Sequence, residues 1–145
     1  MCLGDKPVDE MQEVFESVAR YFSVLGEPTR LRILYALCQD EKCVNEIIKV
    51  TSLAQANASR HLGLMYQAGM LSRRRDGTQV FYKVADPMYI ELCRTVSSLV
   101  AERADGTANS RKNFNHFAQE MTPRRSPKVK ALRNPPANEK EEASV

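Results

Sequence analysis

Apolar residues recur every three to four positions along five stretches of the chain. This spacing places them on one face of an α-helix, so each stretch is predicted to form an amphipathic helix. The five predicted helices cover 9–25, 28–39, 44–50, 53–68 and 87–103. Gly26 ends the first helix, and Pro28 lies in the first turn of the second, which are ordinary helix boundaries. Gly69 stands where a C-terminal cap is expected.

Between the fourth and fifth predicted helices the spacing of apolar residues changes from helical to alternating. Residues 70–75 and 79–84 flank Asp76-Gly77, and this arrangement is a strong signal for a β-hairpin. A short helix, a turn, a longer helix and a hairpin therefore follow one another along the chain. This order is that of a winged helix-turn-helix. The predicted fold class is mainly α with a small β-hairpin.

The chain is predicted to have three segments. Residues 1–8 form a flexible N-terminal arm, 9–104 the winged helix-turn-helix domain, and 105–145 a disordered tail. The tail holds four of the seven prolines, and from 123 to 136 it carries five basic and no acidic residues. Such a composition is typical of disorder. Phe114 and Phe117 are spaced for one further helical turn within it.

Positive charge is concentrated in the middle of the domain. Residues 51–85 carry five Lys or Arg and one Asp, whereas 1–50 carry six basic and nine acidic residues. A basic segment beside acidic ones suits a surface that meets phosphates, because clustered cations release counterions from nucleic acid.

Composition excludes several classes of protein. The chain has 145 residues, 43% hydrophobic and 27% charged, as in an ordinary globular domain. It contains no run of about 18 to 20 apolar residues and no signal peptide pattern, so we expect a cytoplasmic protein with no membrane partner. We expect no enzyme, because the chain lacks a serine-nucleophile motif, a glycine-rich phosphate loop and a paired-acid signature.

The second helix of the helix-turn-helix pair has one packed and one polar face. Ala58, Leu62 and Met65 fall on the stripe that packs on the domain. The polar side and the hairpin supply the candidate DNA contacts, which are Gln55, Asn57, Ser59, Arg60, His61, Arg73, Arg74 and Arg75. Amides pair with adenine and guanidinium groups with guanine, while hairpin arginines suit the backbone or the minor groove. His61 borders the packed stripe, so a structural role competes with DNA contact.

Four blocks in this order resemble the ArsR/SmtB metalloregulators. They lie at 25–34, 56–62, 68–71 and 74–84, and the resemblance covers roughly 13–103. It implies a homodimeric winged-helix repressor of bacterial type, paired through its first and last helices. It also implies that Ser59, Arg60 and His61 lie on the recognition helix, about 54–68. The Ala-Asn-Ala-Ser run at 56–59 is similar to the cadmium-responsive branch.

The metal sites of this family are only partly present. One family site is a Glu-Leu-Cys-Val-Cys-Asp box, but residues 41–46 read Glu-Lys-Cys-Val-Asn-Glu, so one thiolate is replaced by an amide. Cys43 joined by Cys2 from the arm would hold arsenite, cadmium or lead. The alternative is that Cys43 is a small capping residue. The zinc site on the last helix lacks both imidazoles and is predicted to be absent; its positions are Asp86, Met88, Leu99 and Glu102.

Cys38 and Cys93 suggest a second kind of sensor. Thiol-based members of the family pair a cysteine from each of these helices and respond to reactive sulfur species or oxidants. Closing such a dithiol requires Cα atoms within about 7 Å. The alternative is that both cysteines are buried and behave as small hydrophobic residues.

The sequence thus predicts a transcriptional repressor that binds a double-stranded operator as a homodimer. It would need no cofactor and be released by an inducer acting on cysteine thiols. Two rival hypotheses remain. One is a winged-helix module that binds proteins, whose affinity would not depend on salt. The other is a soft-metal or thiol-buffering protein whose contact with DNA is incidental.

Overall fold

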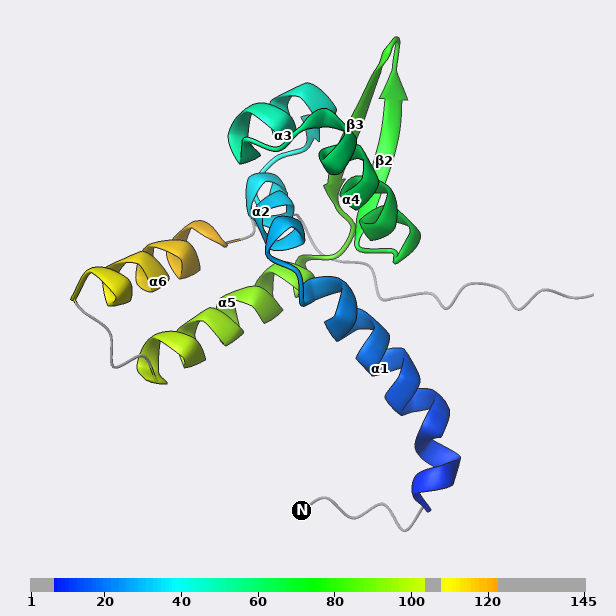
Figure 1. Ribbon diagram of the computed structural model, residues 1–145, viewed down its shortest axis with the longest axis vertical. Coiled ribbons are helices and arrows are strands. Elements are labelled where there is room, and N and C mark those ends of the chain that lie inside the picture. The colour runs from blue at the N-terminus through cyan, green and yellow to red at the C-terminus, as the bar shows by residue number, and fades with distance from the viewer. Residues whose placement is uncertain (1–6, 104–107, 123–145) are drawn as a thin grey trace, which may run out of the picture.

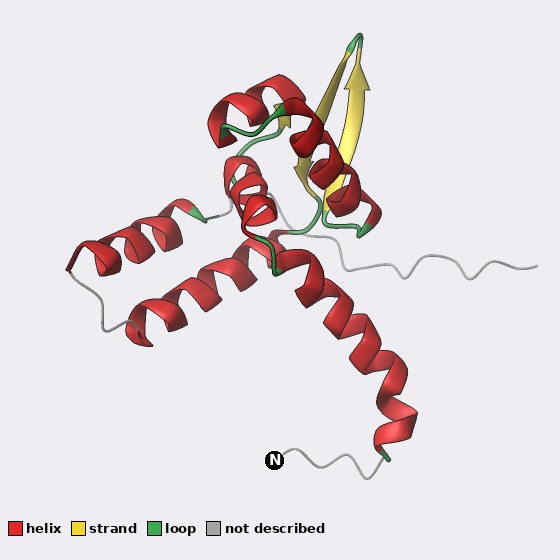
Figure 2. Ribbon diagram, viewed as in Figure 1, coloured by secondary structure: helices red, strands yellow, loops and turns green. Residues whose placement is uncertain are grey.

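A computed structural model describes residues 7–103 and 108–122 of the chain (Figure 1). The domain is mainly helical, with a small sheet that projects beyond the helices (Figure 2). In chain order the elements are a 3-10 helix η1 (Val8–Met11), α1 (Gln12–Leu25), α2 (Pro28–Leu37), β1 (Lys42–Cys43), α3 (Val44–Thr51), α4 (Gln55–Gln67), β2 (Leu71–Asp76), β3 (Gln79–Val84), α5 (Pro87–Arg103) and α6 (Ala108–Glu120). This order confirms the predicted winged helix-turn-helix, with α3 and α4 as the helix pair.

The sheet has three antiparallel strands in the order β1-β3-β2. β2 and β3 form the predicted hairpin around Asp76-Gly77, and Gly77 adopts a φ of +59° at its tip. The third strand, β1, pairs Lys42 with Tyr82 and Cys43 with Phe81. A strand of two residues is too short to show an alternating pattern, so the sequence predicts the hairpin but not β1.

The core lies where α2, α3 and α4 meet the base of the sheet. Its largest fully buried side chains are Ile33, Leu34, Ile47, Leu62, Met65, Met70 and Met121. These residues come from elements across the whole domain, so the helix-turn-helix and the wing rest on one continuous core.

Local signals explain where the helices begin and end. Glu27 caps α2, because its carboxylate accepts a hydrogen bond from the Arg30 backbone N–H at 3.0 Å. After α4, Gly69 has a φ of +77°, a left-handed conformation that glycine adopts without strain. The second helix ends at Leu37, two residues before the predicted boundary at Gln39.

The predicted disordered tail is wrong for residues 108–120, which form α6. This helix lies beside α5 (Figure 1). The ring of Phe117 stacks on Tyr35 with centroids 5.4 Å apart, and Met121 is fully buried. Phe114, Phe117 and Met121 are spaced to share one face, but polar residues around them lower the average apolar density that the prediction used. Of the predicted arm at 1–8, residues 1–6 lie outside the described residues and Val8 begins η1; of the predicted tail, residues 105–107 and 123–145 lie outside them.

Candidate nucleic-acid interface

The outward face of α4 carries the polar side chains that the sequence singled out. Its packed face buries Ala58, Leu62 and Met65 completely. The exposed side chains near its N-terminal end are Gln55, Asn57, Ser59 and Arg60. Within the described ranges, Arg60 has neither an ion pair nor a side-chain hydrogen bond. Its guanidinium group therefore retains all of its donors for an external acceptor.

His61 does not share this exposed face. Its side chain is buried against the domain, and only 6% of the residue is exposed. Its Nδ1 accepts a hydrogen bond from Nε of Arg30 at 3.4 Å. This burial favours the structural alternative for His61 over the predicted DNA contact. In helical spacing His61 lies next to the buried Leu62 and three residues from Ala58, so the packed stripe is wide enough to include it.

The hairpin arginines project to different sides of the wing, because successive residues in a strand face opposite ways. Arg73 turns toward α4, where its guanidinium carbon lies 4.1 Å from the ring centroid of Tyr66. A hydrogen bond with Tyr82 raises the pKa of Arg73, so its charge is permanent. These contacts hold the cation in one place between the recognition helix and the wing.

A cavity of about 360 Å³ lies at this junction. Its lining residues are Tyr66, Arg73, Arg74, Arg75, Val80 and Tyr82. It is large enough for a phosphate group, and three arginines are among its lining residues. Tyr66 was missed by the sequence reasoning. The signal that could have found it is an aromatic residue on the polar side of α4, one turn before the wing.

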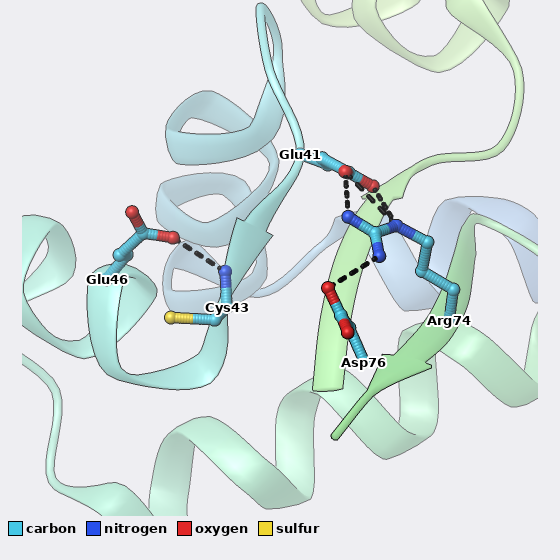
Figure 3. Close-up of polar contacts among 5 residues, drawn as sticks. All are labelled: Glu41, Cys43, Glu46, Arg74 and Asp76. Atoms are coloured by element: carbon cyan, nitrogen blue, oxygen red, sulfur yellow. Dashed lines mark hydrogen bonds and ion pairs between the residues drawn. The ribbon is translucent and has the colours of Figure 1, made fainter. Parts of the chain in front are cut away.

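Arg74 is held by the protein itself (Figure 3). Its Nε donates to both carboxylate oxygens of Glu41 at 3.1 and 3.0 Å, and Nη1 lies 3.7 Å from Asp76 Oδ2. The guanidinium also lies over the ring of Phe81, 4.5 Å from its centroid. The hydrogen bonds from Arg74 lower the pKa of Glu41. The carboxylates offset the charge of Arg74, which leaves it less able to attract phosphates.

Arg75 is exposed beside the turn at the wing tip. Within the part of the chain that the structure describes, no carboxylate pairs with it. The three arginines that look alike in the sequence are thus one stacked cation, one neutralised cation and one exposed cation.

Cys43 is the N-cap residue of α3 and is buried. Its backbone N–H donates to Glu46 Oε2 at 2.8 Å (Figure 3). Hydrogen bonds from the Cys43 backbone and thiol lower the pKa of Glu46. This is the capping role that the sequence analysis held as the alternative to metal binding. Among the described residues, no group of three His, Cys, Asp or Glu is placed to hold a metal ion. Cys2 lies outside those residues.

Cys38 and Cys93 are buried free thiols in the same core cluster. Cys38 Sγ donates to the Glu120 carbonyl of α6 at 3.5 Å. Burial raises the pKa of both thiols, because a thiolate would lose its hydration. Neither thiol is therefore activated as a nucleophile in this conformation.

The chain leaves apolar side chains unpacked on α1 and α5. About half of the surface of each is exposed, and the residues are Val14, Phe15, Val18, Tyr21 and Phe22 on α1 with Val96, Leu99 and Val100 on α5. Contiguous exposed apolar faces of this kind mark an interaction surface. None of the helices in 7–103 or 108–122 is long and apolar enough to cross a membrane.

Known proteins are similar to this chain in sequence and in architecture. The family profile described as "Bacterial regulatory protein, arsR family" matches residues 27–73, from the cap of α2 to the start of the wing. The "Probable mercury resistance operon repressor" of Streptomyces lividans is 33% identical over 89 residues, which cover 61% of this chain and 71% of that protein. The chain belongs to the ArsR family.

Other relatives agree with this family assignment. The "Transcriptional repressor SmtB homolog" of Synechocystis is 30% identical over 114 residues, covering 70% of this chain and 86% of that protein. The structure is also similar to a homodimeric winged helix-turn-helix DNA-binding domain from Mycobacterium bovis. That match has a TM-score of 0.61 and 27% identity, and it covers 71% of this chain and 94% of the other. As an ArsR-family protein, the chain is a transcriptional regulator and not an enzyme.

Proposed function

We propose that this ArsR-family chain is a homodimeric repressor that reads operator DNA with α4 and holds the DNA backbone with its wing. The observation that carries the proposal is the exposed face of α4. There Arg60 stands without an internal partner beside amide and hydroxyl side chains, and next to a wing that presents Arg73 and Arg75. These are the groups that recognise base edges and phosphates.

The exposed faces of α1 and α5 support the dimer. Burying these faces against a second copy of the chain would remove their apolar side chains from water. The resulting dimer would carry two α4 helices. Such a dimer fits half-sites one helical turn apart, about 34–36 Å. The structural relative from Mycobacterium bovis is described as homodimeric.

The wing supplies two kinds of contact in this proposal. The cavity bordered by Tyr66, Arg73 and Tyr82 accepts a backbone phosphate, because its cation is already held in place and loses little freedom on binding. Arg75 reaches the minor groove or a neighbouring phosphate from the wing tip. Arg74 is a structural ion pair and makes little contribution to DNA affinity.

The inducer proposed from the sequence acts on cysteine thiols. Cys38 and Cys93 belong to the same core cluster, and we propose them as a dithiol sensor that responds to reactive sulfur species or an oxidant. Because burial disfavours both thiolates, the reagent must first gain access to the core. Cys43 with Cys2 remains the proposal for arsenite, cadmium or lead.

The first experiment is fluorescence anisotropy with a labelled duplex from the protein's own upstream region and a scrambled duplex. Arg60→Ala is expected to weaken specific binding by about 1–3 kcal/mol, or about 5- to 150-fold, and to leave scrambled binding nearly unchanged. Arg103→Ala, at the end of α5, removes the same charge elsewhere and should have little effect. An equal loss on both duplexes for Arg60→Ala would contradict base reading. Absence of salt-dependent binding would contradict DNA binding.

Adding arsenite, cadmium or a mild oxidant to the same assay tests the inducer. Loss of affinity with the oxidant in the wild type, but not in Cys93→Ser, supports the dithiol. Loss with arsenite or cadmium that Cys43→Ser abolishes supports the metal site. DNA affinity that none of the three agents changes would contradict thiol induction and leave DNA binding intact.

A further inference from the structure

One guanidinium group joins three helices beneath the recognition helix. Arg30 lies in the first turn of α2. Its Nη1 donates to the carbonyl oxygens of Ser23 at 3.3 Å and Val24 at 2.9 Å, in the last turn of α1. Its Nε donates to Nδ1 of His61 on α4 at 3.4 Å. A single side chain therefore connects the end of α1 to the buried side of α4.

The bonds to α1 serve the end of that helix. Carbonyl groups in the last turn have no partner within the helix, and they carry its negative partial charge. A guanidinium group there satisfies two carbonyls at once and complements the dipole. Gly26 follows directly and begins the turn into α2, so Arg30 closes this turn from the other side.

The bond to α4 also fixes the state of His61. Arginine has no acceptor, so Nδ1 must accept, and the imidazole carries its proton on Nε2. Glu27 Oε2 lies 3.8 Å from the same Nδ1 and accepts from the Arg30 backbone N–H at 3.0 Å. Desolvation opposes ionisation of Glu27, but hydrogen bonds from Thr29 and Arg30 lower its pKa. Arg30 thus holds both neighbours, because its backbone N–H binds the Glu27 carboxylate and its side chain binds the His61 imidazole.

Packing alone leaves α1 loosely tied to α4. A cleft of about 300 Å³ is lined by Ser17, Arg20, Tyr21 and Val24 of α1 on one side and by Gln67 and Ala68 at the end of α4 on the other. Beyond this cleft α1 extends away from the rest of the domain (Figure 1). Tyr21 of α1 also packs on Tyr89 of α5, with ring centroids 6.2 Å apart, and Val24 and Leu25 pack against the core. Toward α4, the polar bridge at the C-terminal end of α1 is a direct hydrogen-bonded connection.

We propose that Arg30 and His61 form a clamp that fixes the angle between α1 and the recognition helix, and so sets the distance between the two recognition helices of the dimer. This inference rests on the proposed function. α1 has 14 residues and is about 21 Å long. A tilt of about 10° moves its far end by about 4 Å, close to the rise of about 3.4 Å per base pair. Without the clamp, the distance between the two recognition helices would therefore vary by about one base pair.

A direct contact of Arg30 with DNA is the competing explanation. Its Nε and Nη1 point inward, to an imidazole and two carbonyls, and the residue is partly buried. Arg30 and His61 are accordingly positioning residues that act through α1 and α4. The two explanations differ in what they predict for half-site spacing. Loss of a phosphate contact weakens all spacings equally, whereas a loosened clamp weakens the preferred spacing most.

The test measures affinity on a series of duplexes from the upstream region, after footprinting has located the half-sites, with up to two base pairs added or removed between them. The wild type is expected to lose about tenfold or more for one added base pair. Arg30→Lys keeps the charge but cannot serve both α1 and His61. In this variant one added base pair should lower the affinity by less than about threefold. The dimerisation constant, measured by sedimentation equilibrium, should not change. Arg32→Lys, on the exposed side of the same helix, is the matched control.

His61 supplies the second arm of the test. His61→Ala removes the acceptor and should weaken the dependence of affinity on half-site spacing. His61→Asn places an amide oxygen near the position of the original Nδ1 and should restore that dependence. If Arg30→Lys does not fold, these two variants carry the test. Wild-type spacing dependence in Arg30→Lys and His61→Ala, with or without a uniform loss of affinity, would overturn the clamp while the proposed function stands. Absence of sequence-specific binding by the wild type would overturn both.

Discussion

Replacing Met121 by alanine removes the most deeply buried anchor of α6. The residue is fully buried at the end of that helix. Truncation of a buried methionine costs about 2–5 kcal/mol, because apolar contacts are lost and a cavity remains. The other anchors are the Phe117–Tyr35 stack and the bonds from Cys38 and Gln39 to the Glu120 carbonyl. Each of these contributes about 1 kcal/mol.

The consequence should be local to α6. A helix of 13 residues rich in asparagine is barely stable alone, so undocking and unfolding coincide. A loss of about 3 kcal/mol shifts the docking equilibrium by about 140-fold, because each 1.4 kcal/mol is a factor of ten. The rest of the core keeps its other buried side chains, and α4 should retain its stability.

Hydrogen exchange measured by mass spectrometry tests this reasoning. In Met121→Ala, amide protection within α6 should fall about 100-fold, while protection of α4 changes little. Gln119→Ala is the control, because its side chain is exposed on the same helix. A loss of less than about threefold in α6 would refute the anchoring role. An equal loss in α4 would show that α6 does not open as a separate unit.

Three further predictions concern the wing, the thiols and the backbone. Glu41→Gln frees Arg74 and should steepen the salt dependence of DNA binding by about 0.9 per protomer, measured by anisotropy; an unchanged slope would contradict neutralisation by Glu41. Because burial raises the pKa of Cys38, alkylation by iodoacetamide at pH 7 should be slower in the folded than in the unfolded chain. Equal alkylation rates would refute this. Because the pKa of Cys38 is raised in the folded chain, its contribution to the free energy of unfolding is fully present below the usual thiol pKa and is lost as pH rises through the raised pKa. Gly69→Ala should cost about 1–2 kcal/mol in urea unfolding, because its φ is +77°, whereas Gly63→Ala within α4 should stabilise by about 0.5–1 kcal/mol. Equal effects at the two glycines would contradict the backbone argument.

Local sequence was sufficient for most of the architecture. Periodicity predicted the helices from α1 to α5 with boundaries within about three residues, and Asp76-Gly77 predicted the hairpin. These signals work because apolar spacing and turn chemistry act over a few neighbouring residues. Local sequence did not predict β1, and of α6 it predicted only one helical turn at Phe114 and Phe117. The first is held only by pairing with β3, and the second by docking on α2 and α5.

The sequence by itself also determined which residues lie on the recognition helix and that the wing is basic. Only the tertiary structure decided what each of these side chains does. Glu41 neutralises Arg74 across 33 positions, and Arg30 binds His61 across 31. Partners so far apart leave no periodic signal, because the fold that brings them together depends on all the intervening elements. An arginine reads identically in the sequence whether its charge faces a carboxylate of the same chain or the solvent.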